Sequence, residues 1–252
     1  EADQDFRAGL RLSNGSSAKL DIANITRNGT GILLEKNSSL EGGSGAADDD
    51  ALDYGINVTN NKREGIRIEE GSTLNTEYLL VSQNASAIDT NNDGDTRYPD
   101  AISVRRGSQV NLRQSSIESN PGLALKLYTN SSANFEDTKI KNNGEGLEAI
   151  LHSTIELNRG VTIEGNGGHT LINLRARSAL KSNCDSGNQI LPGSSSGSED
   201  GQDAINGFTS TISLCNIELS GFSAAIEASN NSQVVLEQVT LTQNTEEAVE
   251  LS

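Results

Sequence analysis

A short pattern recurs along this chain at an interval of about 23 residues, a spacing typical of solenoids whose repeats stack on one another. Each copy begins with Gly or Asn followed by Ser, continues with an apolar, a polar and an apolar residue, and ends with Ile, Leu or Val, two polar residues and Asn. Copies occupy residues 15–28, 71–84, 107–120, 130–143 and 230–244. The closing asparagines lie 23 residues apart in two runs, Asn61 and Asn84, then Asn120, Asn143 and Asn166.

Each period holds three short stretches in which apolar and polar residues alternate, the signature of half-buried β-strands. The third stretch follows the closing Asn as a small residue, an apolar residue, any residue and an apolar residue, at 31–34, 65–68, 101–104, 122–125 and 248–251. Nothing repeats at helical spacing. The sequence therefore predicts one all-β domain over residues 1–252, a solenoid with three strands in each coil.

Three strands per coil with Asn at one corner resemble the right-handed parallel β-helix, or pectin-lyase-like, superfamily, and the resemblance covers most of the chain. It implies about nine coils of 22–23 residues. Three insertions interrupt the pattern, at about 41–53, 85–100 and 181–211. Both ends fall inside a repeat, so we expect either a fragment of a longer protein with neighbouring domains or ends that a partner covers.

The second insertion carries the sharpest chemical signal. Residues 89–100 fit a twelve-residue calcium loop, with Gly94 at the sharp turn and oxygen-bearing ligands expected from Asp89, Asn91, Asp93, Asp95 and Asp100. The segment resembles the EF-hand or dockerin loop without its flanking helices. The segment departs from that loop at two positions: position 12 is Asp rather than Glu, and position 8 is Thr96 rather than an apolar residue. The alternative interpretation is an Asx-rich surface turn that binds no ion. The acidic run 48–50 has no such spacing and is interpreted as a solvated charge run.

Enzymes are common on this scaffold, but the motifs of pectate lyases, polygalacturonases and alginate epimerases are absent here. Arg105, Lys126 and Arg175 are weak catalytic candidates, each placed three residues after the first apolar residue of its coil. Glu35 and Glu69 hold the same place in earlier coils, so we favour ion pairs between neighbouring strands. The two histidines are interpreted as structural, His169 at a coil corner and His152 at the turn position before Ser.

The net charge of −16 disfavours nucleic acid and anionic membrane surfaces as partners. It also counts against an anionic polysaccharide, unless a cation bridges the two. Cys184 and Cys215 flank the third insertion, where a disulfide is expected that would indicate an oxidising compartment; two free thiols are the alternative. Sequons occur at Asn24, Asn57 and Asn130 among others, in a chain rich in Asn and Ser.

Two functions follow as hypotheses. The first is a non-catalytic, calcium-binding, secreted or surface β-helix module with an adhesion, binding or spacer role, whose ligand is a polysaccharide or a cell-surface molecule. The second is a polysaccharide lyase or hydrolase that acts on an acidic polysaccharide. Missing motifs and the scarcity of histidine favour the first. A deep groove containing a carboxylate and a Lys or Arg, walled by the 41–53 and 181–211 insertions, would favour the second.

Overall fold

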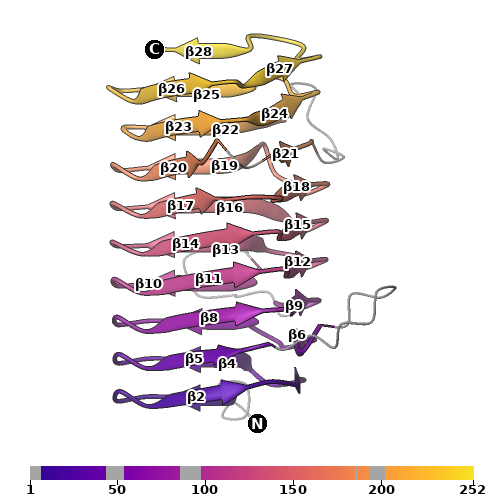
Figure 1. The fold of residues 1–252 in the computed structure, drawn as a ribbon, viewed down its shortest axis with the longest axis vertical. Coiled ribbons are helices and arrows are strands. Elements are labelled where there is room, and N and C mark those ends of the chain that lie inside the picture. Colours follow the sequence, from indigo (N-terminus) through magenta and orange to yellow (C-terminus); the bar gives the residue numbers. More distant parts are fainter. Residues whose placement is uncertain (1–6, 44–53, 86–97, 185–186, 193–201) are drawn as a thin grey trace.

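The computed structural model describes residues 7–43, 54–85, 98–184, 187–192 and 202–252. Within these residues the chain forms strands and no helix, and the strands make three sheets of ten, nine and nine members. All paired strands are parallel, and successive coils stack from the N-terminal to the C-terminal end (Figure 1). The protein is an all-β parallel β-helix solenoid, as the repeat predicts.

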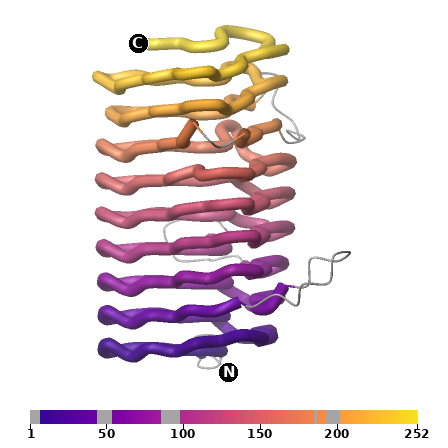
Figure 2. Tube along the Cα trace, in the orientation of Figure 1, coloured from indigo at the N-terminus to yellow at the C-terminus, as the bar shows by residue number. Residues whose placement is uncertain are grey.

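Each coil contributes one strand to each sheet, so the strands of a sheet follow one another in chain order along the stack (Figure 2). Sheet A contains β1 (Ala8–Leu12), β4 (Thr30–Leu34), β7 (Ile66–Ile68), β10 (Ile102–Arg105), β13 (Leu123–Tyr128), β16 (Glu145–Ile150), β19 (Thr170–Arg175), β22 (Asp203–Phe208), β25 (Ile226–Ser229) and β28 (Val249–Leu251). Sheet B contains β2 (Ser17–Leu20), β5 (Ser39–Gly42), β8 (Thr73–Glu77), β11 (Gln109–Arg113), β14 (Ser132–Glu136), β17 (Thr154–Leu157), β20 (Ala179–Ser182), β23 (Thr211–Cys215) and β26 (Gln233–Glu237). Sheet C contains β3 (Ala23–Thr26), β6 (Ile56–Thr59), β9 (Leu79–Ser82), β12 (Ser116–Glu118), β15 (Lys139–Lys141), β18 (Thr162–Glu164), β21 (Asn188–Ile190), β24 (Ile217–Ser220) and β27 (Thr240–Thr242).

The core is a column of apolar side chains enclosed by the three sheets. Because side chains alternate between the two faces of a strand, every second residue points inward. Parallel in-register pairing then places like residues above one another, as with Ile66, Ile102 and Leu125, which are all fully buried. Fully burying one such side chain contributes about 1.5–3 kcal/mol, so the column is the main source of stability.

The corner between sheets C and A is held by a ladder of asparagines, all of them buried except the first, Asn28. The side-chain oxygen of each Asn accepts hydrogen bonds from the preceding Asn: Asn143 Oδ1 accepts from the backbone N–H of Asn120 at 3.1 Å and from its Nδ2 at 2.8 Å. The ladder runs through Asn28, Asn61, Asn84, Asn120, Asn143 and Asn166. It satisfies backbone groups that the corner would otherwise bury unpaired.

The corner between sheets A and B uses the repeated Ser in the same way. The backbone N–H of Ser38 donates to Oγ of Ser72 at 3.1 Å, and that of Ser72 donates to Oγ of Ser108 at 3.2 Å. Before these serines the chain turns through two left-handed residues, such as Arg106 and Gly107 with φ of 56° and 73°. This geometry explains why Gly and Asn recur immediately before Ser.

The insertions leave the coils at two corners. The segments 44–53 and 183–187 both join sheet B to sheet C, five coils apart, as expected for the first and third insertions. The segments 86–97 and 191–201 both join sheet C to sheet A. Residues 181–211, predicted as a single insertion, also contain β21 and β22, because Ile190 and Ile205 keep their places in the core.

Candidate functional site: a charged groove on sheet A

The candidate residues Arg105, Lys126 and Arg175 all lie on the outer face of sheet A, but they do not share one row. Arg105 is in register with Tyr128, and Arg175 is in register with Ile150, which follows Tyr128 in the same row. Lys126 is in register with Ser103 and Glu148 instead. The prediction of one common position is therefore wrong for Lys126.

The error comes from the length of β13. This strand has six residues, and its third residue, Leu125, rather than its first, Leu123, stands beside Ile102. Counting back from the corner serines gives the true register, since Arg105, Tyr128 and Arg175 each lie three residues before such a Ser. The same count reveals Tyr128, which a search for charged residues passed over.

A hollow of about 410 Å³ opens between β10 and β13. It is lined by the cationic side chains of Arg105, Arg106 and Lys126 and by the carboxyl group of Asp100. Tyr128 and Thr129 complete the lining. Two of these cations already have carboxylate partners, Lys126 in Glu148 and Arg106 in Glu69 and Glu70. Tyr128 stands at its edge with 39% of its surface exposed.

Asp100 is the most perturbed acidic group of the groove. Burial raises the pKa of its carboxyl group to about 6, and the negative charges of Glu64 and Glu148 add to the rise. Lys126 and Arg105 oppose this effect by favouring the carboxylate. Because desolvation outweighs the two cations, Asp100 changes its charge close to neutral pH.

Arg105 is held in place but keeps its charge available. Its Nε donates a hydrogen bond to Oγ of Ser103 at 2.9 Å, which fixes the plane of the guanidinium group. No carboxylate within the described ranges forms an ion pair with it. The remaining N–H groups can therefore bind a planar anion such as a carboxylate through two parallel hydrogen bonds.

A second hollow, of about 290 Å³, continues along β16 and β19. Glu148 lies at its base, 6% exposed, with one oxygen 3.0 Å from Nζ of Lys126 and the other 3.2 Å from a terminal nitrogen of Arg175. Arg106 likewise contacts Glu69 and Glu70 at 3.4 and 3.1 Å. Ion pairs thus connect neighbouring coils along this face, as the alternation of charges predicts.

The two histidines occupy different places. His169 follows the left-handed Gly168 at the entry to β19 and lines the second hollow. His152 is itself left-handed, with φ of 64°, and fills the corner position before Ser153 that Gly or Asn holds elsewhere. Its location is the structural one predicted from the repeat.

The predicted calcium ligands Asp89, Asn91, Asp93 and Asp95, and the acidic run 48–50, lie outside the described residues. Asp100, the fifth ligand of the set, lies in the first hollow beside Lys126 and Arg105. The calcium site therefore stays a prediction from the sequence.

The disulfide expected from the sequence is present. Cys184 and Cys215 are joined, with their Cα atoms 4.7 Å apart, at the ends of the neighbouring strands β20 and β23. It closes a loop of 31 residues. Glu237 lies near the two sulfur atoms, but sulfurs joined to each other are not available to hold a metal ion.

Fold and groove together define a parallel β-helix protein with a charged groove along one sheet. Comparison with models of protein families, with curated proteins and with solved structures found no match to the chain. Across the described residues, no helix has the length and apolar character needed to cross a membrane.

Proposed function

We propose that the protein is a non-catalytic, secreted or surface-displayed module that binds an acidic polysaccharide in the groove of sheet A and holds calcium in the loop 89–100. The observation that carries the proposal is the guanidinium group of Arg105, which lines the hollow and forms no ion pair in the described part of the chain. A uronate carboxylate can pair with this group, and the exposed ring of Tyr128 offers a flat surface for the sugar ring.

The charge of Asp100 makes binding depend on pH. In calcium-free buffer, where Asp100 is not bound to the ion, its carboxylate competes above pH 6 with the uronate carboxylate for Arg105 and Lys126, whereas below pH 6 the neutral carboxyl group can donate a hydrogen bond. A uronate carboxyl group stays ionised down to about pH 4, since free carboxyl groups have pKa values of about 3.3–4.3. We therefore expect the tightest binding between about pH 4 and pH 6.

Isothermal titration with a galacturonate hexamer at pH 5 and pH 7.5 tests this binding. Arg105→Gln removes the fixed guanidinium group and is expected to weaken binding by roughly tenfold or more. Arg27→Gln is the matched control, because Arg27 is an exposed corner residue outside sheet A. Equal affinities of Arg105→Gln and the wild type, or no binding at either pH, would contradict the groove assignment.

The calcium part of the proposal is supported by the spacing of Asp89, Asn91, Asp93, Asp95 and Asp100, and by the need to neutralise carboxylates placed so densely. Calorimetry with calcium on the wild type and on Asp89→Ala measures it, with Asp48→Ala as the control from the other acidic run. Identical titrations of the wild type and Asp89→Ala would end the loop assignment. A secreted or surface location is compatible with the disulfide, since such bonds persist in oxidising compartments.

A polysaccharide lyase or hydrolase is the second candidate, favoured by one observation. A carboxyl group whose pKa is raised to about 6 beside a lysine in a groove is suited to proton transfer near neutral pH. Absorbance of unsaturated products reports lyase activity on uronate polymers, and release of reducing ends reports hydrolysis. Turnover that Asp100→Asn abolishes, without loss of binding at pH 5, would establish the enzyme in place of the binding module.

A further inference from the structure

One outward row of sheet A shows the same pair of side chains at two places. Parallel in-register pairing sets Arg105, Tyr128, Ile150, Arg175 and Phe208 above one another on five successive coils, from β10 to β22. Each arginine is thus followed on the next coil by an exposed aromatic ring, Tyr128 at 39% and Phe208 at 49%. We call Arg105 with Tyr128 the first unit and Arg175 with Phe208 the second unit. They lie three coils apart, which is about 14 Å at the usual strand separation.

The same local contact orients both arginines. Nε of Arg105 donates to Oγ of Ser103 at 2.9 Å, and Nε of Arg175 donates to Oδ1 of Asn173 at 3.4 Å. Each acceptor lies two residues earlier on the same strand, where the side chain points to the same face. Both guanidinium groups are therefore restrained through Nε, which leaves their terminal nitrogens for other partners.

The guanidinium group of the second unit is not neutralised by its carboxylate neighbour. One terminal nitrogen of Arg175 lies 3.2 Å from Glu148, but Nζ of Lys126 contacts the same carboxylate at 3.0 Å. Two cations thus share one negative charge. In the part of the chain that the structure describes, the other terminal nitrogen of Arg175 has no partner, and the side chain is 54% exposed. A carboxylate from a ligand can therefore pair with it.

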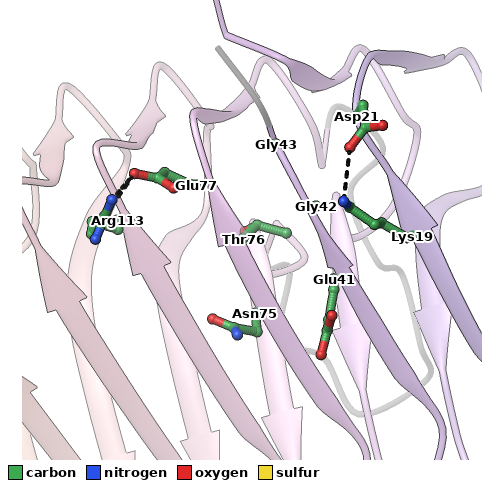
Figure 3. A pocket seen from close by; sticks show the side chains of 9 residues that line it. All are labelled: Lys19, Asp21, Glu41, Gly42, Gly43, Asn75, Thr76, Glu77 and Arg113. Carbon is green, nitrogen blue, oxygen red and sulfur yellow. Dashed lines mark hydrogen bonds and ion pairs between the residues drawn. The ribbon is translucent and has the colours of Figure 1, made fainter.

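Sheet B shows the opposite arrangement. A hollow of about 390 Å³ on its outer face is flanked by two ion pairs, Lys19 with Asp21 and Arg113 with Glu77 (Figure 3). Nε and Nη2 of Arg113 both bind the same oxygen of Glu77, and none of the described residues that line the hollow is aromatic. An arginine joined to one carboxylate of a neighbouring coil stabilises the stack, and the two units of sheet A depart from that arrangement.

We propose that Arg175 and Phe208 form a second binding unit for the acidic polysaccharide, so that one ligand chain runs along the solenoid axis and occupies both units. The inference rests on the proposed binding of uronates at Arg105. In each unit a ligand carboxylate pairs with the arginine, and the next sugar ring lies against the aromatic ring. Between the units the row offers the apolar, partly buried side chain of Ile150 and no carboxylate.

The spacing of the units sets the length of ligand that can span them. Sugar rings of an extended chain advance by a distance similar to the strand separation, so about three sugar residues separate the two bound carboxylates. A galacturonate trimer is then too short to reach both units, whereas a hexamer is long enough. The hexamer gains affinity because its second contact is made within one complex.

Titration of the trimer and the hexamer in calcium-free buffer at pH 5 distinguishes one unit from two. The trimer should bind with a stoichiometry of two per chain, and the hexamer should bind once and more tightly. Carbon-13 labelling of the Phe and Tyr rings gives an independent readout by NMR. The resonances of Tyr128 and Phe208, assigned with Tyr128→Ser and Phe208→Ser, should both shift with either ligand.

Arg175→Gln removes the second guanidinium group and leaves Glu148 paired with Lys126. It should weaken hexamer binding by roughly tenfold. It should also abolish the shift of Phe208 with the trimer while the shift of Tyr128 remains. Phe208→Ser should weaken hexamer binding in the same way, and its side chain is exposed enough for the substitution to leave folding intact.

Two substitutions away from sheet A are the matched controls. Arg159→Gln removes an arginine that is likewise exposed and ion-paired, at the corner between sheets B and C. Val235→Ser removes an exposed apolar side chain from the outer face of sheet B. Neither should change the affinity or the stoichiometry of either ligand. Thermal unfolding of all variants separates a loss of binding from a loss of folding.

The second unit and the groove fail in different ways. If Arg105→Gln weakens hexamer binding but Arg175→Gln and Phe208→Ser bind the hexamer as the wild type does, the second unit is overturned and the groove stands. A trimer that binds once and leaves the Phe208 resonance unshifted also overturns the second unit. If neither ligand binds at up to about 10 mM, the groove and the second unit fall together.

Discussion

Replacement of Asn120 by Ala tests whether the asparagine ladder holds the coils together. Asn120 is 1% exposed. Its Nδ2 donates to the carbonyl oxygen of Val81 at 3.0 Å and to Oδ1 of Asn143 at 2.8 Å. Its Oδ1 accepts from the backbone N–H of Asn84 at 2.9 Å and from Nδ2 of Asn84 at 3.3 Å. The substitution removes these four bonds, and also the bond from Nδ2 of Asn120 to the carbonyl oxygen of Glu118 at 3.0 Å.

The magnitude follows from what is left behind. The backbone N–H of Asn84 becomes a buried donor without a partner, which costs about 1–3 kcal/mol. Loss of the bonds to Val81 and Asn143 removes about 0.5–1.5 kcal/mol each. We expect the free energy of unfolding to fall by about 4 kcal/mol.

Equilibrium unfolding in guanidinium chloride, followed by far-ultraviolet circular dichroism, measures this change. Asn24→Ala is the control, because Asn24 is exposed on the outer face of β3; it should change the free energy by less than about 0.5 kcal/mol. A loss below about 1 kcal/mol for Asn120→Ala would refute the account of the corner, since the net value of a single ordinary hydrogen bond is of that size.

Other perturbations give equally definite results. Burial raises the pKa of Asp100 in the folded chain to about 6 from 3.8, so the wild type loses stability as pH rises between these values. Relative to the wild type, Asp100→Asn should therefore be more stable by about 3 kcal/mol at pH 7 and equally stable below about pH 3.5. Urea titrations in calcium-free buffer measure this difference. A gain that does not vary with pH would contradict this assignment. Replacing Cys184 and Cys215 together by Ser should cost about 3–4 kcal/mol under oxidising conditions, judged from the closed loop, and reductant should have no further effect on the variant. Gly43→Ala should lower the free energy of unfolding by about 2 kcal/mol or more, because φ is 86° and the added Cβ would lie 1.4 Å from the carbonyl oxygen of Glu77. An unchanged unfolding midpoint would show that the backbone relaxes there.

The architecture was accessible from the sequence because a solenoid repeats its local rules. The 23-residue spacing of Asn120, Asn143 and Asn166 predicts the stacking of coils, and the recurring Ser before each strand of sheet B lies at the second corner in the structure. Both signals depend only on residues within one coil and its neighbour. The same reasoning identified Cys184 and Cys215 as partners.

The functional surfaces were less accessible because they depend on register across coils of unequal length. The pattern of apolar residues places Lys126 in the row of Arg105, because it does not reveal that β13 has two more residues than β10 before the first paired position, Ile102 beside Leu125. The enclosure of Asp100, which sets its pKa, depends on packing that no local pattern encodes.

The asparagine ladder has a direction. In each pair, Nδ2 of one Asn donates to Oδ1 of the Asn in the following coil. Each coil therefore offers the following coil the same donor that it accepts from the preceding one. A chain from which residues 121–143 were excised would bring Asn120 against Asn166, which offers the same acceptor that Asn143 supplied. The hydrogen bonds of this corner are therefore compatible with the insertion or deletion of whole coils, and a groove along a sheet becomes longer or shorter with the number of coils that line it.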